Sequence, residues 1–317
     1  MPIRSMLTKV TAVPYKNAYR PGAVYKADEI LKDITAIMRD FKPTKIFVSH
    51  PCDHNPDHQS LYLFTQVALW DLEKELNPEI YPYLIHFKKW PQPYGYRPEM
   101  PLIPPVFFNE KIAWNILPLT EAEVAKNYNA IREHRSQYNS SAKYLCSFMR
   151  ANELFGDFPV VKLMSKKGLV SLSSDRMEYF KDLPEQLLDK EQAEFVGVEE
   201  EFLKIENDLL VFTLKLSRPL GETTGVSLYL FGYKDDTPFS DMPKIHIQFG
   251  MVEHKIFNQR QKLPLEAVQV ERKTKQIKIS IPLKLLASPD RILTSVRTYA
   301  GAVPLDWVAW RILEILN

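Results

Sequence analysis

Residues 45–70 read K-I-F-V-S-H-P-C-D-H-N-P-D-H-Q-S-L-Y-L-F-T-Q-V-A-L-W. The apolar run 46–48, which follows Pro43, is typical of a strand that is buried on both faces of a parallel sheet. Asn55 and Pro56 then indicate a helix start, because asparagine is a good N-cap and proline at the first helical position loses no hydrogen bond. The polar cluster between strand and helix is therefore expected where open α/β sheets bind their ligands.

The cluster packs three histidines and two aspartates into nine residues, namely His50, Asp53, His54, Asp57 and His58. Imidazole and carboxylate groups are the ligands expected for zinc, and a catalytic zinc takes three protein ligands and a water. A neighbouring carboxylate, Asp57 or Asp53, is expected to orient His58. The alternative is a polar loop in which these side chains only form hydrogen bonds. The number of such side chains within nine residues favours a metal site over a polar loop.

The same stretch resembles the second signature of the PIG-L/LmbE-like N-acetylglucosaminyl deacetylases, a strand followed by H-P-x-D-x-H-P-D-H. The resemblance continues at residues 84–93, L-I-H-F-K-K-W-P-Q-P, and at residues 152–155, N-E-L-F, and it covers about residues 10–160. It implies a Rossmann-like, partly parallel sheet. It also implies a zinc-dependent enzyme that removes acetyl groups from N-acetylated amino sugars or similar small amides.

Two departures from the family pattern bear on function. The first signature, H-P-D-D-E, supplies a zinc-binding histidine, a zinc-binding aspartate and the general base in the family, and it does not occur in this chain. His50 and Asp53 share its spacing, but Cys52 stands where the base would be, so we interpret that match as a coincidence. Asn55 replaces a histidine that is thought to stabilise the oxyanion or protonate the leaving amine. Asparagine can donate a hydrogen bond but cannot exchange a proton, so His54 is expected to compensate.

The resemblance therefore implies that His58 is a metal ligand, that Asn55 or His54 faces the oxyanion and that Asp57 tunes its neighbours. The other ligands and the base would come from a missing N-terminal segment or from a partner chain. A local zinc site made by His50, Asp53 and His58 alone ranks lower, because it has no obvious base. The alternative from a different class is an inactive remnant that binds glycan or protein.

A proline-rich loop, 90–105, is expected to form a wall of the site, since loops of that length in a compact domain often do. Tyr94 and Arg97 could line a sugar pocket, and His86, at the end of a predicted strand, could face the cluster. A surface loop held by aromatic anchors and a histidine hydrogen-bonded in the core are equally weighted alternatives.

Periodicity predicts the remaining elements of the first half. A helix over 24–41 is expected to pack a stripe of apolar side chains on the sheet, and a helix over 56–76, a strand over 80–87 and two later helices should follow. The first of those later helices opens with a capping box at Thr120, and the second covers about 141–154. The predicted stripe consists of Ile30, Ile34, Ile37, Met38 and Phe41, and the second helix should bury Leu61, Phe64, Ala68 and Leu72.

The periodicity changes to alternation after residue 194, which predicts an antiparallel β-sandwich over 194–317, joined by a linker over 161–193 to a deacetylase-like domain over 1–160. Predicted strands cover 209–216, 226–233, 244–249, 276–281 and 292–299. Aromatic side chains of this half permit carbohydrate binding by stacking, although buried aromatics of a structural domain are the favoured interpretation. The aromatics considered exposed are Tyr229, Tyr233, Phe239 and Trp307.

Composition excludes several classes of partner. The net charge is +2, from 41 basic and 39 acidic residues, so no charge imbalance points to nucleic acid. No apolar stretch has the length of a membrane span, and no leader is visible, which makes a cytoplasmic location the default expectation. Two cysteines in well-separated parts of the chain predict no disulfide. The expected ligand is a small molecule or a glycan.

Overall fold

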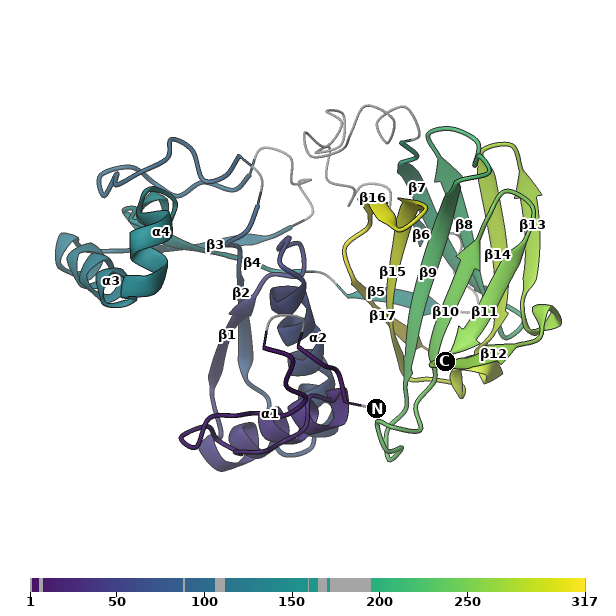
Figure 1. Cartoon of the computed structure of the whole chain (residues 1–317), viewed down its shortest axis with the longest axis horizontal. Coiled ribbons are helices and arrows are strands. Elements are labelled where there is room, and N and C mark those ends of the chain that lie inside the picture. Colours follow the sequence, from purple (N-terminus) through teal and green to yellow (C-terminus); the bar gives the residue numbers. More distant parts are fainter. Residues whose placement is uncertain are drawn as a thin grey trace.

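The computed structural model describes residues 2–5, 8–87, 89–105, 112–158, 160–164, 170–171 and 195–316. The chain is mixed α/β, as expected. Helices and short strands form the first half, and two large, mostly antiparallel sheets form the second half (Figure 1). No helix of the described part combines the length and the apolar character needed to span a membrane. The two cysteines, both in the described part, are buried, and no disulfide joins them.

The first half begins with α1 (Ala27–Phe41), β1 (Lys45–Ser49), α2 (Pro56–Asp71) and β2 (Glu79–Tyr83). The strands β1 and β2 pair in parallel, with matching residues from one end of each strand to the other. The predicted start of α2 is confirmed, because the Asn55 side chain accepts a hydrogen bond from the Asp57 backbone at 2.9 Å. Because the two strands are parallel, the turn after β1 lies next to the end of β2.

The buried face of α1 differs from the predicted apolar stripe. Leu31 and Met38 are buried in the cluster that α1 shares with α2, whereas Ile37 is 46% exposed and Phe41 is 79% exposed. The apolar arc of this helix is wider than the surface that covers it, so only the part facing α2 is withdrawn from water. The same holds for Leu61 of α2, which was predicted to be buried and is 44% exposed.

A second layer of the first half consists of β3 (Trp114–Pro118), α3 (Glu121–Glu133), α4 (Arg135–Leu145), a 3₁₀ turn and β4 (Asn152–Gly156). The capping box at the start of α3 is confirmed. The predicted helix over 141–154 is wrong at its end, because residues 152–156 pair with β3 as an antiparallel strand. Leu154 and Phe155 are buried there, and this tertiary contact overrides the local helical pattern.

The second half contains two sheets that share one core. The larger sheet has the strand order β12-β11-β10-β9-β15-β17-β5, with β16 paired to β15, and the smaller has the order β13-β14-β8-β7-β6. Apolar side chains from both sheets form the largest buried cluster of the described residues. The strands are β5 (Val161–Met164), β6 (Val170–Ser171), β7 (Val198–Glu206), β8 (Leu209–Leu216), β9 (Thr224–Tyr233), β10 (Lys244–Phe249), β11 (His254–Asn258), β12 (Gln261–Leu263), β13 (Gln269–Lys273), β14 (Gln276–Pro282), β15 (Arg291–Ala300), β16 (Val303–Trp307) and β17 (Arg311–Leu316).

Two strands fall within the predicted linker over 161–193. The strand β5 pairs in parallel with β17, and β6 pairs with β7. The rest of that predicted linker, 165–169 and 172–193, lies outside the described residues.

The aromatics predicted to be exposed in this half are mostly covered. Tyr233 is 1% exposed, and its ring packs against Trp70 of α2 at a centroid distance of 5.0 Å. Tyr229 and Phe239 are half-buried where the larger sheet faces the helical part. The side chain of Trp307 lies outside the described residues. Burial against α2 is the physical reason why Tyr233 cannot stack on a sugar.

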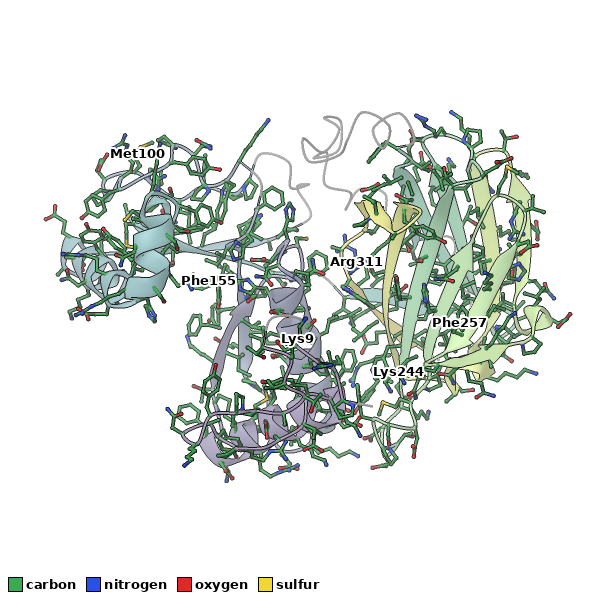
Figure 2. All side chains as sticks on the ribbon, viewed as in Figure 1. Lys9, Met100, Phe155, Lys244, Phe257 and Arg311 are labelled. Atoms are coloured by element: carbon green, nitrogen blue, oxygen red, sulfur yellow. The ribbon has the colours of Figure 1, made fainter. Side chains whose placement is uncertain are left out.

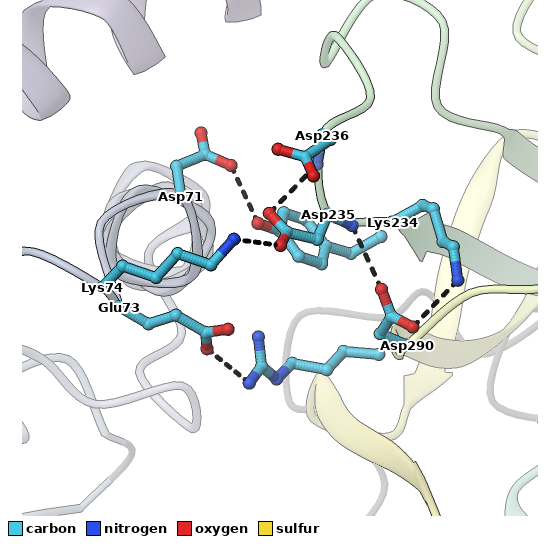
Figure 3. A network of polar contacts seen from close by, with 9 residues as sticks. Asp71, Glu73, Lys74, Lys234, Asp235, Asp236 and Asp290 are labelled. Carbon is cyan, nitrogen blue, oxygen red and sulfur yellow. Dashed lines mark hydrogen bonds and ion pairs between the residues drawn. The ribbon is translucent and has the colours of Figure 1, made fainter. Parts of the chain in front are cut away.

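The two halves meet through an apolar cluster with a polar margin. Side chains of α1, α2, β9, β15 and β17 share this cluster, and Arg311 lies between the halves (Figure 2). At the margin, the Tyr233 hydroxyl donates to Asp71 at 3.0 Å, and the end of α2 forms ion pairs with the sheet (Figure 3). These pairs are Lys74 with Asp235 at 2.8 Å and Glu73 with Arg291 at 2.6 Å.

Candidate functional site

Asp53 is the centre of the polar cluster after β1. Its side chain is completely buried. One carboxylate oxygen accepts a hydrogen bond from the Asn55 backbone at 2.8 Å, and the other accepts from Ile85 at 3.1 Å and His86 at 2.9 Å. A buried carboxylate needs such donors to offset the loss of water. Asp53 therefore joins the turn before α2 to the segment that follows β2.

His58 lies beside this carboxylate on the first turn of α2. Its Nδ1 is 3.1 Å from Asp53 Oδ2, and its side chain is 29% exposed. The ring nitrogen is not aligned for a straight hydrogen bond, but catalytic contacts are often poorly aligned before substrate binds. The carboxylate favours the tautomer with the proton on Nδ1, which makes Nε2 the lone-pair nitrogen of the ring. The pair can therefore serve as a base or as one metal ligand with its orienting carboxylate.

Aromatic rings continue from His58 along one side. The His86 ring centre is 4.9 Å from that of His58, and His86 in turn stacks on Tyr144 at 6.1 Å. Tyr144 donates its hydroxyl to the Ile85 carbonyl at 2.5 Å and contacts the Tyr94 ring. Burial, together with the charge of Asp53, raises the pKa of Tyr144, so the phenol stays protonated. The structure thus places the predicted residue His86 beside His58, and Tyr94 joins the same row of rings through Tyr144.

Tyr144 was not predicted from the sequence. It lies on α4, far along the chain from the cluster, and no spacing pattern joins the two. An aromatic residue on a polar helix is the only signal that could have pointed to it.

His50 does not join this group, which corrects the predicted ligand set of His50, Asp53 and His58. Its ring is fully buried and lies between Trp114, stacked at 5.7 Å, and Phe158, edge-on at 5.3 Å. Its Nδ1 accepts a hydrogen bond from the Cys52 backbone at 3.1 Å. Burial, helped by the nearby charge of Arg311, lowers the pKa of His50 to about 3, so the ring is neutral. The strand end directs this side chain into the core rather than toward α2.

His54 and Asn55 have structural contacts where oxyanion contacts were predicted. The His54 ring packs against Phe87 at 5.1 Å, and its backbone donates to the His86 carbonyl at 2.8 Å. The Asn55 side-chain oxygen caps α2. Both residues therefore hold the turn around Asp53, and the amide nitrogen of Asn55 is the group that could still meet a substrate.

Asp57 and Arg97 lie at the surface. Asp57 is exposed in the first turn of α2, where the helix dipole favours its charge. Arg97 donates to the Tyr96 carbonyl at 3.1 Å. Within the described structure, neither side chain forms a hydrogen bond or an ion pair with Asp53 or His58, so the predicted roles in tuning and substrate binding stay predictions.

The described residues do not complete a zinc site. Across the described ranges, no group of three or more His, Cys, Asp or Glu side chains is placed to hold a metal ion. Both oxygens of Asp53 already accept backbone hydrogen bonds, and His50 lies in a separate apolar setting. Of the three predicted ligands His50, Asp53 and His58, it is His58 whose ring lies beside a carboxylate that can orient it.

The local geometry is thus an oriented histidine beside an aromatic wall, built where a parallel strand ends and a helix begins. No protein-family model matches the chain, and no curated protein matches it.

Proposed function

We propose that the chain is part of a zinc-dependent deacetylase that acts on N-acetylated amino sugars or similar small amides. The proposal also assigns a Rossmann-like domain to the first half and a β-sandwich to the second. The resemblance of residues 45–58 to the second deacetylase signature supports it. The observation that carries it is the buried Asp53 carboxylate, 3.1 Å from His58 Nδ1.

The Asp53–His58 pair would act through the second ring nitrogen. Asp53 holds the imidazole and favours a proton on Nδ1, so that Nε2 can accept a proton or bind a metal ion. The rings of His86, Tyr144 and Tyr94 lie alongside and would offer apolar faces to a sugar ring. The described residues of this chain supply too few ligands to hold zinc by themselves.

We further propose that a partner chain supplies the remaining ligands. In the described part of the chain, β1 pairs on one side only, with β2. Phe47 of β1 is 56% exposed, and a neighbouring groove of about 550 Å³ has a mainly apolar lining that includes Phe47, Leu117 and Phe155. An unpaired strand beside an apolar groove is a surface that a further strand can extend.

A second candidate function is an inactive remnant that binds glycan or protein. The observation that favours it is the full use of Asp53 by three backbone donors, which gives this residue a structural role without any catalysis. In that case the orientation of the His58 ring by Asp53 would serve neither catalysis nor metal binding.

Zinc affinity of the purified chain, measured by competition with a chromophoric chelator, tests the deacetylase proposal. We expect weak binding of about one zinc that is lost in His58→Ala and weakened in Asp53→Asn. His134→Ala is the matched control, because this histidine is exposed at the junction of α3 and α4, and it should bind as the wild type does. Zinc binding that is as strong in His58→Ala as in the wild type would contradict the proposal and favour the remnant.

A further inference from the structure

A cavity of about 320 Å³ lies between α2 and the larger sheet, away from the Asp53–His58 pair. Ligand sites are commonly of this size, mainly apolar and found where two domains meet. Here α2 forms one wall, and β9, β10 and β15 form the other. The apolar lining includes Leu63, Phe64, Val67, Tyr229, Phe231 and Trp310.

One cation lines this apolar cavity. Lys244, the first residue of β10, is half-buried where the larger sheet faces the helical part (Figure 2). Its Nζ donates to the Phe239 carbonyl at 2.5 Å and to the Met242 carbonyl at 3.0 Å, and it lies 4.2 Å from the centre of the Phe239 ring. An ammonium group has three donors, so these carbonyls use two of them.

No carboxylate neutralises this cation at close range. Among the described residues, Lys244 forms no ion pair, and Asp28 and Asp241 act on it only from a distance. Burial lowers the pKa of Lys244, which reflects the cost of holding the charge in an apolar setting. An anionic group placed against Nζ would recover part of that cost.

Flat side chains give the cavity a defined shape. The His246 ring stacks on Tyr229 at 4.4 Å with an angle of 13° between the rings, and Tyr229 lies 6.2 Å from Trp310. His246 Nε2 is 3.0 Å from the Ser227 hydroxyl, and burial lowers the pKa of His246, so this ring is neutral at pH 7. Lys244 is therefore the charged group that a ligand would meet beside aromatic faces.

We propose that this cavity binds a small amphipathic anion, a flat apolar body with one carboxylate that pairs with Lys244. The apolar body would fill the space between α2 and the aromatic side chains of the sheet. A ligand of about 10 to 20 non-hydrogen atoms suits a cavity of this size. The proposal does not depend on the deacetylase function, because none of the residues that carry it belongs to the Asp53–His58 site.

Calorimetric titration with matched compounds tests the proposal on the full chain. The probes are 1-naphthaleneacetate, indole-3-acetate and decanoate, with 1-naphthaleneacetamide as the uncharged match of the first. We expect at least one carboxylate to bind at a ratio of one to one. For the naphthalene pair, we expect the carboxylate to bind about tenfold more tightly than the amide.

Variants separate the charge from the cavity. Lys244→Met should reduce the affinity for the carboxylate to that for the amide, while Lys244→Arg should keep the preference. Leu63→Trp should fill the cavity and remove binding of both compounds, and it serves as a second probe if Lys244→Met does not fold. Lys255→Met is the matched control, since Lys255 is exposed on β11.

Two outcomes would overturn the proposal. One is that no carboxylate of the three binds the wild type. The other is that folded Lys244→Met, or folded Leu63→Trp, binds the carboxylate as tightly as the wild type does.

Discussion

Asp53 is the residue on which the local structure most depends. Its two oxygens accept three backbone hydrogen bonds in a completely buried setting. In Asp53→Asn one of those oxygens becomes an N–H₂ group that faces a backbone donor, so we expect a loss of about 2–4 kcal/mol in the free energy of unfolding. Urea denaturation measures it. Asp57→Asn, exposed on the same turn, should change stability by less than about 0.5 kcal/mol, and an equal loss in both variants would contradict the assigned role.

Glu153, a half-buried carboxylate, predicts an effect of pH on stability. Burial raises the pKa of Glu153 above its usual 4.5, although the Asn127 amide, which donates to it at 3.0 Å, lowers it in part. The folded state therefore holds this proton more tightly than the unfolded state does, so the contribution of Glu153 to stability is lost as pH rises above about 4.5.

Glu153→Gln keeps an acceptor for Asn127 and cannot ionise. We expect this variant to be more stable than the wild type at pH 7, with a difference that shrinks toward pH 4. Thermal unfolding at several pH values measures this. Glu133→Gln, at an exposed position, is the control, and its stability difference from the wild type should not change with pH. A difference that grows toward pH 4 would show that the sign is wrong.

For single residues, the sequence predicted which polar side chains lie near each other after β1 better than it predicted the more distant residues that contact them. The adjacency of Asp53 and His58 follows from a strand end and a helix start, and the sequence shows both. The position of the His50 ring cannot be read from the local sequence. Its direction depends on Trp114 and Phe158, which come from later parts of the chain. For the same reason, the contact of Tyr144 with His86 has no sequence signal.

Among the elements, α2 gives the clearest prediction. The Asn55 side chain accepts from the Asp57 backbone at 2.9 Å, and Pro56 begins the helix. Asn55→Ala should lower the free energy of unfolding by about 1 kcal/mol, whereas Asn55→Ser keeps a capping oxygen and should lose little. Equilibrium denaturation of both variants checks this. Equal stability of Asn55→Ala and the wild type would mean that the cap contributes nothing.

Local patterns located the helices and the strands β1, β2, β8, β9, β10, β14 and β15, but they missed the other strands. The bounds of β8 and β10 agree with the predicted strands, because alternation is strong in both. The strand β7 was not predicted, since its run of three glutamates hides the alternation, and β4 was taken for the end of a helix. In both cases pairing with another strand decides the structure, and no local pattern shows that pairing.

At the scale of the whole molecule, the contact between the halves predicts unequal effects of two changes. Tyr233 is buried, and its hydroxyl donates to Asp71 at 3.0 Å (Figure 3). Tyr233→Phe removes the hydrogen bond that this buried tyrosine donates to a carboxylate, so we expect a loss of about 1–2 kcal/mol. The Lys74 side chain is 72% exposed, so Lys74→Met should cost less than about 1 kcal/mol despite its ion pair.

Urea denaturation followed by tryptophan fluorescence measures both changes. A larger loss in Lys74→Met than in Tyr233→Phe would contradict the importance assigned to the buried contact. The way the halves pack was beyond sequence reasoning. The alternation of apolar and polar residues does not distinguish an exposed aromatic side chain from a buried one. Tyr233 was predicted to be exposed for that reason.

The tautomer of His58 shows whether Asp53 prepares this ring as a base or a metal ligand. Two-bond ¹⁵N–¹H correlation spectra of the wild type and His58→Ala would assign the ring and show which nitrogen carries the proton. We expect a proton on Nδ1, held by Asp53, and a shift toward the Nε2 tautomer in Asp53→Asn. A proton on Nε2 in the wild type would contradict the claim that Asp53 prepares His58 as a base or a metal ligand.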